Sequence, residues 1–93
     1  MVDLNKIIQA KRTIANFVRN TELYESKKLS VLSGAEVFVK RENLQRTGAY
    51  KIRGAYNKIA HLSDEQKQGG VIAASAGNHA QGVALSAREF GVR

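Results

Sequence analysis

The sequence predicts a layered α/β fold in which short parallel strands are covered by helices on both faces. Two observations predict this fold class. Segments whose apolar residues recur at the helical period alternate with short strand-like runs, in the order helix, strand, helix, strand, helix. The run at 71–74 is wholly apolar rather than alternating, as is typical of parallel strands that are buried on both faces.

A first helix is predicted to begin after Asp3, whose carboxylate can accept hydrogen bonds from the free N–H groups of the first turn. Apolar residues follow at near-helical spacing from Leu4 onward, and basic residues occupy the opposite face. This helix is expected to end near Phe17.

A strand is predicted after the first helix. Following a polar stretch, Ser33–Gly34 is expected to form a turn. Residues 36–40 include β-branched and aromatic side chains, which favour a short strand. Residues 41–48 are expected to form the loop between this strand and the next helix.

The second half of the chain has the clearest helical period, over residues 50–62. Ser63 is predicted to cap a short helix that stops at Gly69–Gly70. The apolar strand at 71–74 follows. A turn of small residues then leads into a last helix, with Gly91 at its C-terminal stop.

The composition is that of a folded globular protein, with 43 % hydrophobic and 25 % charged residues. Cysteine is absent and there are 2 histidines, which excludes disulfides, thiolate metal sites and a conventional zinc site. No metal is therefore expected, and a reducing, cytoplasmic location fits. No apolar run approaches the roughly 18 residues of a membrane span, and no signal peptide is visible.

The net charge of +7 raises the question of a nucleic-acid partner, because clustered Lys and Arg side chains bind phosphate backbones. The basic residues are instead spread along the chain in pairs such as Lys11–Arg12 and Lys27–Lys28, with glutamates interspersed. This pattern indicates solvated faces, so neither a nucleic-acid nor a membrane partner is expected. A small basic nucleic-acid-binding module is the alternative from a different class.

A lysine in a first helical turn, Lys51, is the first candidate for chemistry. The free N–H groups and the helix dipole there disfavour a second positive charge and favour the neutral amine. A neutral amine can attack an aldehyde to form an imine. Gly48 and Gly54, on either side, permit close approach of a ligand or another helix. Taken alone, this position is more typical of an ordinary surface lysine.

The second candidate is the small-residue turn at the start of the last helix, residues 75–82. Free N–H groups in such a turn form a nest for a carboxylate or phosphate. Ser75 supplies a hydroxyl, Gly77 flexibility, and Asn78 an amide that can bond to a planar ligand. An ordinary capped helix has the same pattern. His79 has no partner carboxylate in the sequence pattern, and no catalytic role is assigned to it.

The two segments together resemble the fold-type II pyridoxal-phosphate enzymes. Within them the chain is most similar to the serine/threonine dehydratase family, which includes the catabolic threonine dehydratases (threonine ammonia-lyases). The resemblance covers essentially the whole chain and is strongest at 40–55 and 75–82. It implies part of a three-layer parallel-sheet fold of the tryptophan-synthase-β-like type.

The resemblance also implies site residues. Lys51 takes the place of the Schiff-base lysine, preceded by Tyr50 where phenylalanine is usual. Asn78 matches the asparagine that bonds to the 3'-hydroxyl of the cofactor, pyridoxal 5'-phosphate. The loop that closes on the substrate carboxylate corresponds to Ser75, Ala76, Gly77, Asn78 and His79.

The implied activity is deamination of L-threonine or L-serine, by β-elimination of water, to a 2-oxo acid and ammonia. Lys51 would remove the α-proton. Racemases of this group have a second serine at the position of Ala76, where it can reprotonate the opposite face. Dehydration is therefore favoured over racemisation, with a racemase or a β-replacing synthase as the alternatives.

The chain is expected to be an N-terminal fragment, because it stops where an α/β chain would start its next strand. By the resemblance, residues 1–47 belong to the larger cofactor domain and residues 48–93 to the start of the smaller, mobile one. The glycine-rich loop that binds the cofactor phosphate lies further downstream in the family. The fragment alone is expected to be inactive and without cofactor, and the partner expected is a further copy, in a homo-oligomer or a self-associating fragment.

Overall fold

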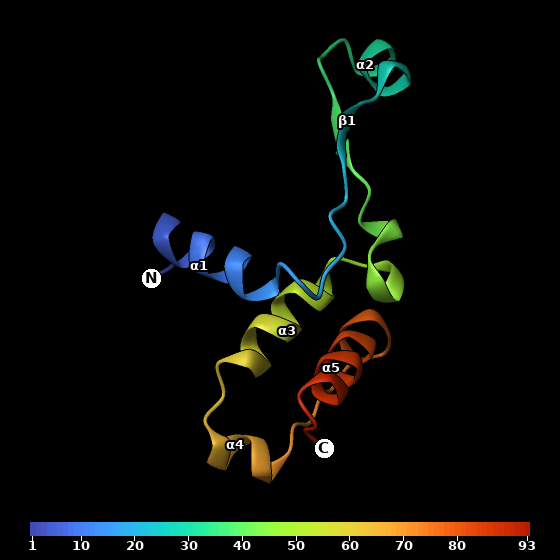
Figure 1. Ribbon diagram of the computed structural model, residues 1–93. Coiled ribbons are helices and arrows are strands. Elements are labelled where there is room, and N and C mark those ends of the chain that lie inside the picture. The colour runs from blue at the N-terminus through green and yellow to red at the C-terminus, as the bar shows by residue number, and fades with distance from the viewer.

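The computed structural model describes all 93 residues as short helices and one small sheet (Figure 1). The radius of gyration is 16.0 Å, against about 12 Å for a compact domain of this length. The difference arises because an arm made of β1, α2 and β2 projects away from the helices (Figure 1). In chain order the elements are α1 (Leu4–Ile14), β1 (Leu23–Glu25), α2 (Lys27–Ser33), β2 (Phe38–Lys40), the 3-10 helices η1 (Glu42–Leu44) and η2 (Arg46–Gly48), α3 (Lys51–Ala60), α4 (Asp64–Gly69) and α5 (Asn78–Glu89).

The first helix, α1, begins as the sequence predicts. The Asp3 carboxylate accepts a hydrogen bond from the Lys6 N–H at 2.9 Å and so satisfies a donor of the first turn. The helix ends at Ile14, three residues before the expected end. There the Phe17 N–H bonds to the Ile14 carbonyl at 3.0 Å, and this tighter turn directs Phe17 into the core.

The arm contains the only sheet, which is antiparallel and two-stranded. The strand predicted at 36–40 forms in its second half, as β2. Neither β1 nor α2 is predicted by the sequence pattern. Ser26 caps α2 by accepting a bond from the Leu29 N–H at 3.4 Å, and Gly34 ends it in a left-handed conformation. The paired residues are Leu23↔Lys40, Tyr24↔Val39 and Glu25↔Phe38.

The core lies mainly where α3 and α5 pack against each other. Gly82 of α5 lies so close to α3 that a Cβ there would be 3.3 Å from the Cα and N atoms of Ile52. Ser86, one turn later, is fully buried and donates its hydroxyl to the Gly82 carbonyl at 2.7 Å. These two small residues let the helix backbones approach closely. An apolar cluster of Ile59, Ala87 and Val92 continues the contact toward the C-terminal end.

Three aromatic rings join the segment after α1, helix α3 and the C-terminal cap of α5. The rings of Phe17 and Tyr56 are stacked with centroids 4.2 Å apart, and Tyr56 meets Phe90 in a tilted arrangement at 4.8 Å. Aromatic pairs in such geometries contribute about 0.5–1.5 kcal/mol beyond the area that they bury. Tyr56 is therefore the central contact between the N-terminal segment and the two packed helices.

The short helix α4 forms as expected, with a reciprocal capping box between Ser63 and Gln66. The strand predicted at 71–74 is wrong, because residues 70–77 form no helix or strand. Of this run, Val71 alone forms a sheet-like bond, donating its N–H to the Arg93 carbonyl at 2.6 Å, and Ile72 is fully exposed. A buried strand needs a partner for its backbone groups, so the predicted parallel sheet is not formed within residues 1–93.

No helix of the chain combines the length and apolar character that crossing a membrane requires. No group of three or more His, Asp or Glu side chains is placed to bind a metal ion.

Candidate functional site

The segment before Lys51, predicted from the sequence as a loop at 41–48, contains regular secondary structure. It forms η1 and η2, and two consecutive left-handed residues, Thr47 (φ 61°) and Gly48 (φ 70°), reverse the chain. After these two residues the chain enters α3, and Lys51 is the first residue of that helix. Its side chain is exposed. The expected place of Lys51 in a first helical turn is therefore confirmed.

A pocket of about 370 Å³ brings Lys51 to the second motif. The close approach of the two helices explains this, because the carbonyl carbon of Lys51 lies 3.5 Å from where a Cβ of Gly82 would stand. Three predicted site residues, Tyr50, Lys51 and His79, are thus together. The lining consists of Tyr50, Lys51, Arg53, Gly54, Ala55 and His79.

The rest of the second motif lies outside this pocket. Ser75, Ala76 and Asn78 are exposed, and Gly77 is half-buried. The Ser75 hydroxyl accepts a bond from the Gly77 N–H at 3.3 Å, which occupies one donor of the expected anion nest. No side chain caps α5, so the N–H groups of its first turn have no side-chain partner at the cap.

A cluster made of Glu42, Arg53 and Thr21 includes the residue two positions after Lys51 in α3 and was not identified from the sequence. Arg53 donates from Nε to Oε2 of Glu42 at 2.9 Å and from Nη2 to Oε1 at 2.8 Å. The Thr21 hydroxyl donates to the same Oε1 atom. The glutamate side chain is 17 % exposed. We call this the Glu42–Arg53–Thr21 cluster.

Hydrogen bonding within the cluster stabilises both charges. The bonds from Arg53 are the main cause that lowers the pKa of Glu42 to about 2, with the Thr21 hydroxyl and the charges of Arg53 and Lys40 acting in the same direction and partial burial opposing them. The bond to Glu42 raises the pKa of Arg53 above its usual value. No sequence signal marks these partners, which are separated by 11 residues or more and share no helix face.

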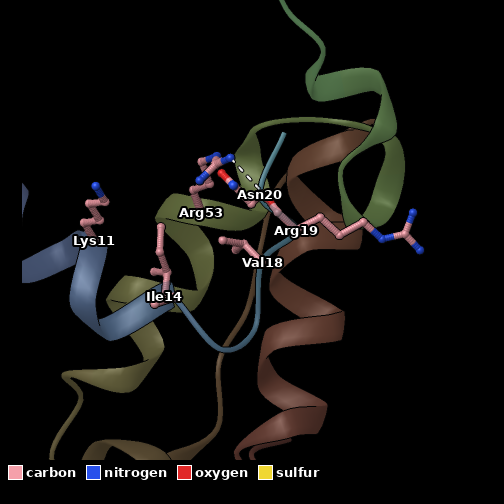
Figure 2. A pocket seen from close by; sticks show the side chains of 7 residues that line it. Lys11, Ile14, Val18, Arg19, Asn20 and Arg53 are labelled. Atoms are coloured by element: carbon pink, nitrogen blue, oxygen red, sulfur yellow. Dashed lines mark hydrogen bonds between the residues drawn. The ribbon is translucent and has the colours of Figure 1, made fainter. Parts of the chain in front are cut away.

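A separate pocket of about 310 Å³ lies between α1, the segment that follows it and Arg53 of α3 (Figure 2). Three cationic residues, Lys11, Arg19 and Arg53, contribute to its lining. Figure 2 shows the Arg19 side chain extending away from Lys11 and Arg53. Since Arg53 is paired with Glu42, the three charges do not converge on a common point where they could bind an anion.

Comparison with known proteins decides the family. The family described as "Pyridoxal-phosphate dependent enzyme" matches residues 14–93. The chain belongs to this family. The match includes both candidate motifs, and the resemblance deduced from the sequence is confirmed.

Relatives in this family are similar over nearly the whole chain. L-threonine ammonia-lyase of Thermotoga maritima is 59 % identical over 92 residues, which are 99 % of this chain and 23 % of that protein. The catabolic L-threonine dehydratase TdcB of Staphylococcus aureus is 55 % identical over 99 % of this chain and 27 % of its own length. The chain therefore spans about a quarter of the length of these relatives.

Solved structures of pyridoxal-phosphate enzymes share this arrangement. Maize serine racemase superposes with a TM-score of 0.89 and 42 % identity, over 98 % of this chain and 29 % of that one. The T.th. threonine deaminase gives a TM-score of 0.85 and 41 % identity, over 98 % of this chain and 32 % of that one. The predicted fold type, fold-type II, is confirmed by these neighbours, and the chain contains part of it.

The residues at the pocket that contains Lys51 fit the cofactor of this family. A volume of about 370 Å³ lies within the roughly 300–1,000 Å³ usual for small-ligand sites. Lys51 offers an accessible amine for an aldehyde, and Tyr50, which is 63 % exposed, offers an aromatic face. The uncapped start of α5 adds N–H donors for an anionic group.

Proposed function

We propose that the full-length protein containing this chain is a threonine dehydratase. It would convert L-threonine or L-serine into a 2-oxo acid and ammonia by eliminating water, with pyridoxal 5'-phosphate as cofactor. The observation that carries the proposal is the pocket in which Lys51 meets His79 of the second motif. It supports this activity because relatives 55–59 % identical are named L-threonine ammonia-lyase and dehydratase.

When bound, the cofactor supplies an electron sink for the negative charge that develops at the substrate α-carbon. Lys51 Nζ is the group that would bind the cofactor covalently and then accept the α-proton. The Asn78 amide would hydrogen-bond to the cofactor 3'-hydroxyl. The substrate carboxylate would be bound by backbone N–H groups of the second motif, which comprises Ser75, Ala76, Gly77, Asn78 and His79.

A racemase is the second candidate, since maize serine racemase is among the similar structures. Racemisation requires a proton donor on the face opposite the lysine. Ala76 has no hydroxyl and cannot serve as that donor. This position favours dehydration.

We also propose how the chain fits into the larger protein. Residues 1–47 would belong to the larger cofactor domain and residues 48–93 to the smaller, mobile one. Exposed apolar side chains such as Leu4 of α1 (70 % exposed) and Leu32 of α2 (74 %) are then covered by the rest of the enzyme or by a second copy. The chain alone would be inactive, and the absence of cysteine fits a cytoplasmic enzyme.

The test uses the full-length protein incubated with pyridoxal 5'-phosphate. Borohydride reduction followed by mass spectrometry should find a pyridoxyl adduct on Lys51, and threonine or serine should yield a 2-oxo acid. Lys51→Ala should lose both, whereas Lys27→Ala, in the distant arm, should lose neither. Racemisation without 2-oxo acid would contradict the proposed reaction. Covalent attachment that persists in Lys51→Ala would contradict the proposed site.

A further inference from the structure

The Glu42–Arg53–Thr21 cluster joins three separate segments at a point two residues from Lys51. Arg53 follows Lys51 in the first turn of α3, and the Arg53 N–H bonds to the Tyr50 carbonyl at 3.0 Å. The side chains of Arg53 and Lys51 are therefore attached to the same helical turn. Anchoring the guanidinium of Arg53 to Glu42 restrains the position of that turn.

The loop closed by Glu42 and Arg53 contains a disfavoured backbone conformation. Thr47 has φ 61°, in the left-handed region that a β-branched residue rarely adopts. Its hydroxyl is buried without a hydrogen-bond partner, so no side-chain bond stabilises this conformation locally. A strained residue persists only where the surrounding structure imposes it. The two-bond link between the ends of this loop supplies such a constraint.

The constraint extends into the segment that follows α1. Gln45 accepts a bond from the Arg19 N–H and donates one to the Arg19 carbonyl, both at 2.8 Å. Figure 2 shows the Arg53 side chain reaching from α3 toward Arg19 and Asn20, and its Nη2 atom lies 3.5 Å from the Arg19 carbonyl. Because the pKa of Glu42 is lowered to about 2, both members of the ion pair stay charged near neutral pH.

We propose that Arg53 and Glu42 are positioning residues for Lys51. Their paired hydrogen bonds close the loop between residues 42 and 53 and fix the direction in which α3 presents the lysine to the pocket. The inference rests on the proposed function, in which Lys51 carries the cofactor. Arg53 acts on the reaction through the lysine, because its guanidinium is occupied by Glu42.

The test compares two conservative variants of the full-length protein. Arg53→Lys keeps the charge but loses the paired donors, and Glu42→Gln keeps the shape but loses the charge. The rate of cofactor attachment to Lys51 is followed by borohydride trapping, and kcat and KM for threonine are measured separately. Each variant should slow attachment and lower kcat by roughly 10- to 100-fold, with a much smaller change in KM. All rates are compared at a temperature well below the thermal unfolding midpoint of each protein.

The matched control is Arg41→Lys. Arg41 directly precedes Glu42, but its side chain lies in an exposed pair with Glu22 at 3.7 Å and forms no hydrogen bond or ion pair with Glu42 or Arg53. The Arg41→Lys variant should therefore attach cofactor at the wild-type rate. Unchanged attachment and kcat in Glu42→Gln would overturn the inference, even if Arg53→Lys failed to fold. A wild-type protein that attached no cofactor would overturn the proposed function and the inference together.

Discussion

Replacing Gly82 tests whether close helix packing places the two motifs. Gly82 is buried in α5, and an added Cβ would stand 3.3 Å from the Cα and N atoms of Ile52 and 3.5 Å from the carbonyl carbon of Lys51. These neighbours are backbone atoms, which cannot rotate away as a side chain could. Gly82→Ala should therefore push the first turn of α3 away from α5.

Two opposing effects set the magnitude. Alanine gains about 1 kcal/mol over glycine in a helix interior. Overpacking a tight core contact costs about 1–3 kcal/mol, so a net destabilisation of about 1 kcal/mol is expected for Gly82→Ala. Gly54 is the matched control, because it lies within α3 and a Cβ there would meet no atom within 4 Å. Gly54→Ala should stabilise the protein by about 0.5–1 kcal/mol.

The measurement is urea unfolding of the two full-length variants and the wild type, monitored by circular dichroism. The free energies of unfolding of the two variants should differ by about 2 kcal/mol, in opposite directions from wild type. Equal stabilisation by Gly82→Ala and Gly54→Ala would contradict this prediction, because it would mean that α3 and α5 are not in close contact at Gly82.

Three further predictions concern stability. The pKa of Glu42 is depressed from 4.5 to about 2, so its pairing with Arg53 stabilises the fold above about pH 4.5 and is lost as the pH falls toward 2. After allowance for solvent screening, this stabilisation amounts to about 1–2 kcal/mol. Unfolding measurements at pH 7 and near pH 2 should show that Glu42→Gln has a lower free energy of unfolding than wild type only at pH 7. Gln45→Ala removes both hydrogen bonds to the Arg19 backbone and should lower the free energy of unfolding in urea by about 1–3 kcal/mol. An unchanged urea midpoint would show that water replaces these two hydrogen bonds. Tyr56→Ala removes the middle ring of the aromatic trio and should cost about 2–4 kcal/mol by thermal unfolding, while Tyr56→Phe should stay within about 0.5 kcal/mol of wild type.

The helices were predictable because their signals are local. Asp3 and Ser63 cap the helices that they were expected to cap, and the apolar period that begins near Tyr50 corresponds to α3. Capping and periodicity depend on residues within one or two turns of each other. The sequence contains this information whatever the rest of the chain does.

The strands were less predictable because pairing is not local. β1 has three residues, Leu23–Glu25, and exists through bonds to Phe38–Lys40, which lie a whole helix away. The apolar run at 71–74 has the composition of a strand, yet beyond Val71 its backbone finds no partner within residues 1–93. Composition indicates what a segment can become, and a neighbour is needed before it becomes a strand.

For the site, the sequence was sufficient to identify Lys51 and the small-residue turn before α5 as candidates, and to predict the family through the two motifs together. It could not reveal that Gly82 brings these segments to one pocket, nor that Glu42 pairs with Arg53 of the helix that carries the lysine. The physical reason is distance along the chain. Helix caps and turn residues act on their immediate neighbours, whereas pockets and partly buried ion pairs such as Glu42–Arg53 arise where packing joins segments that share no local pattern.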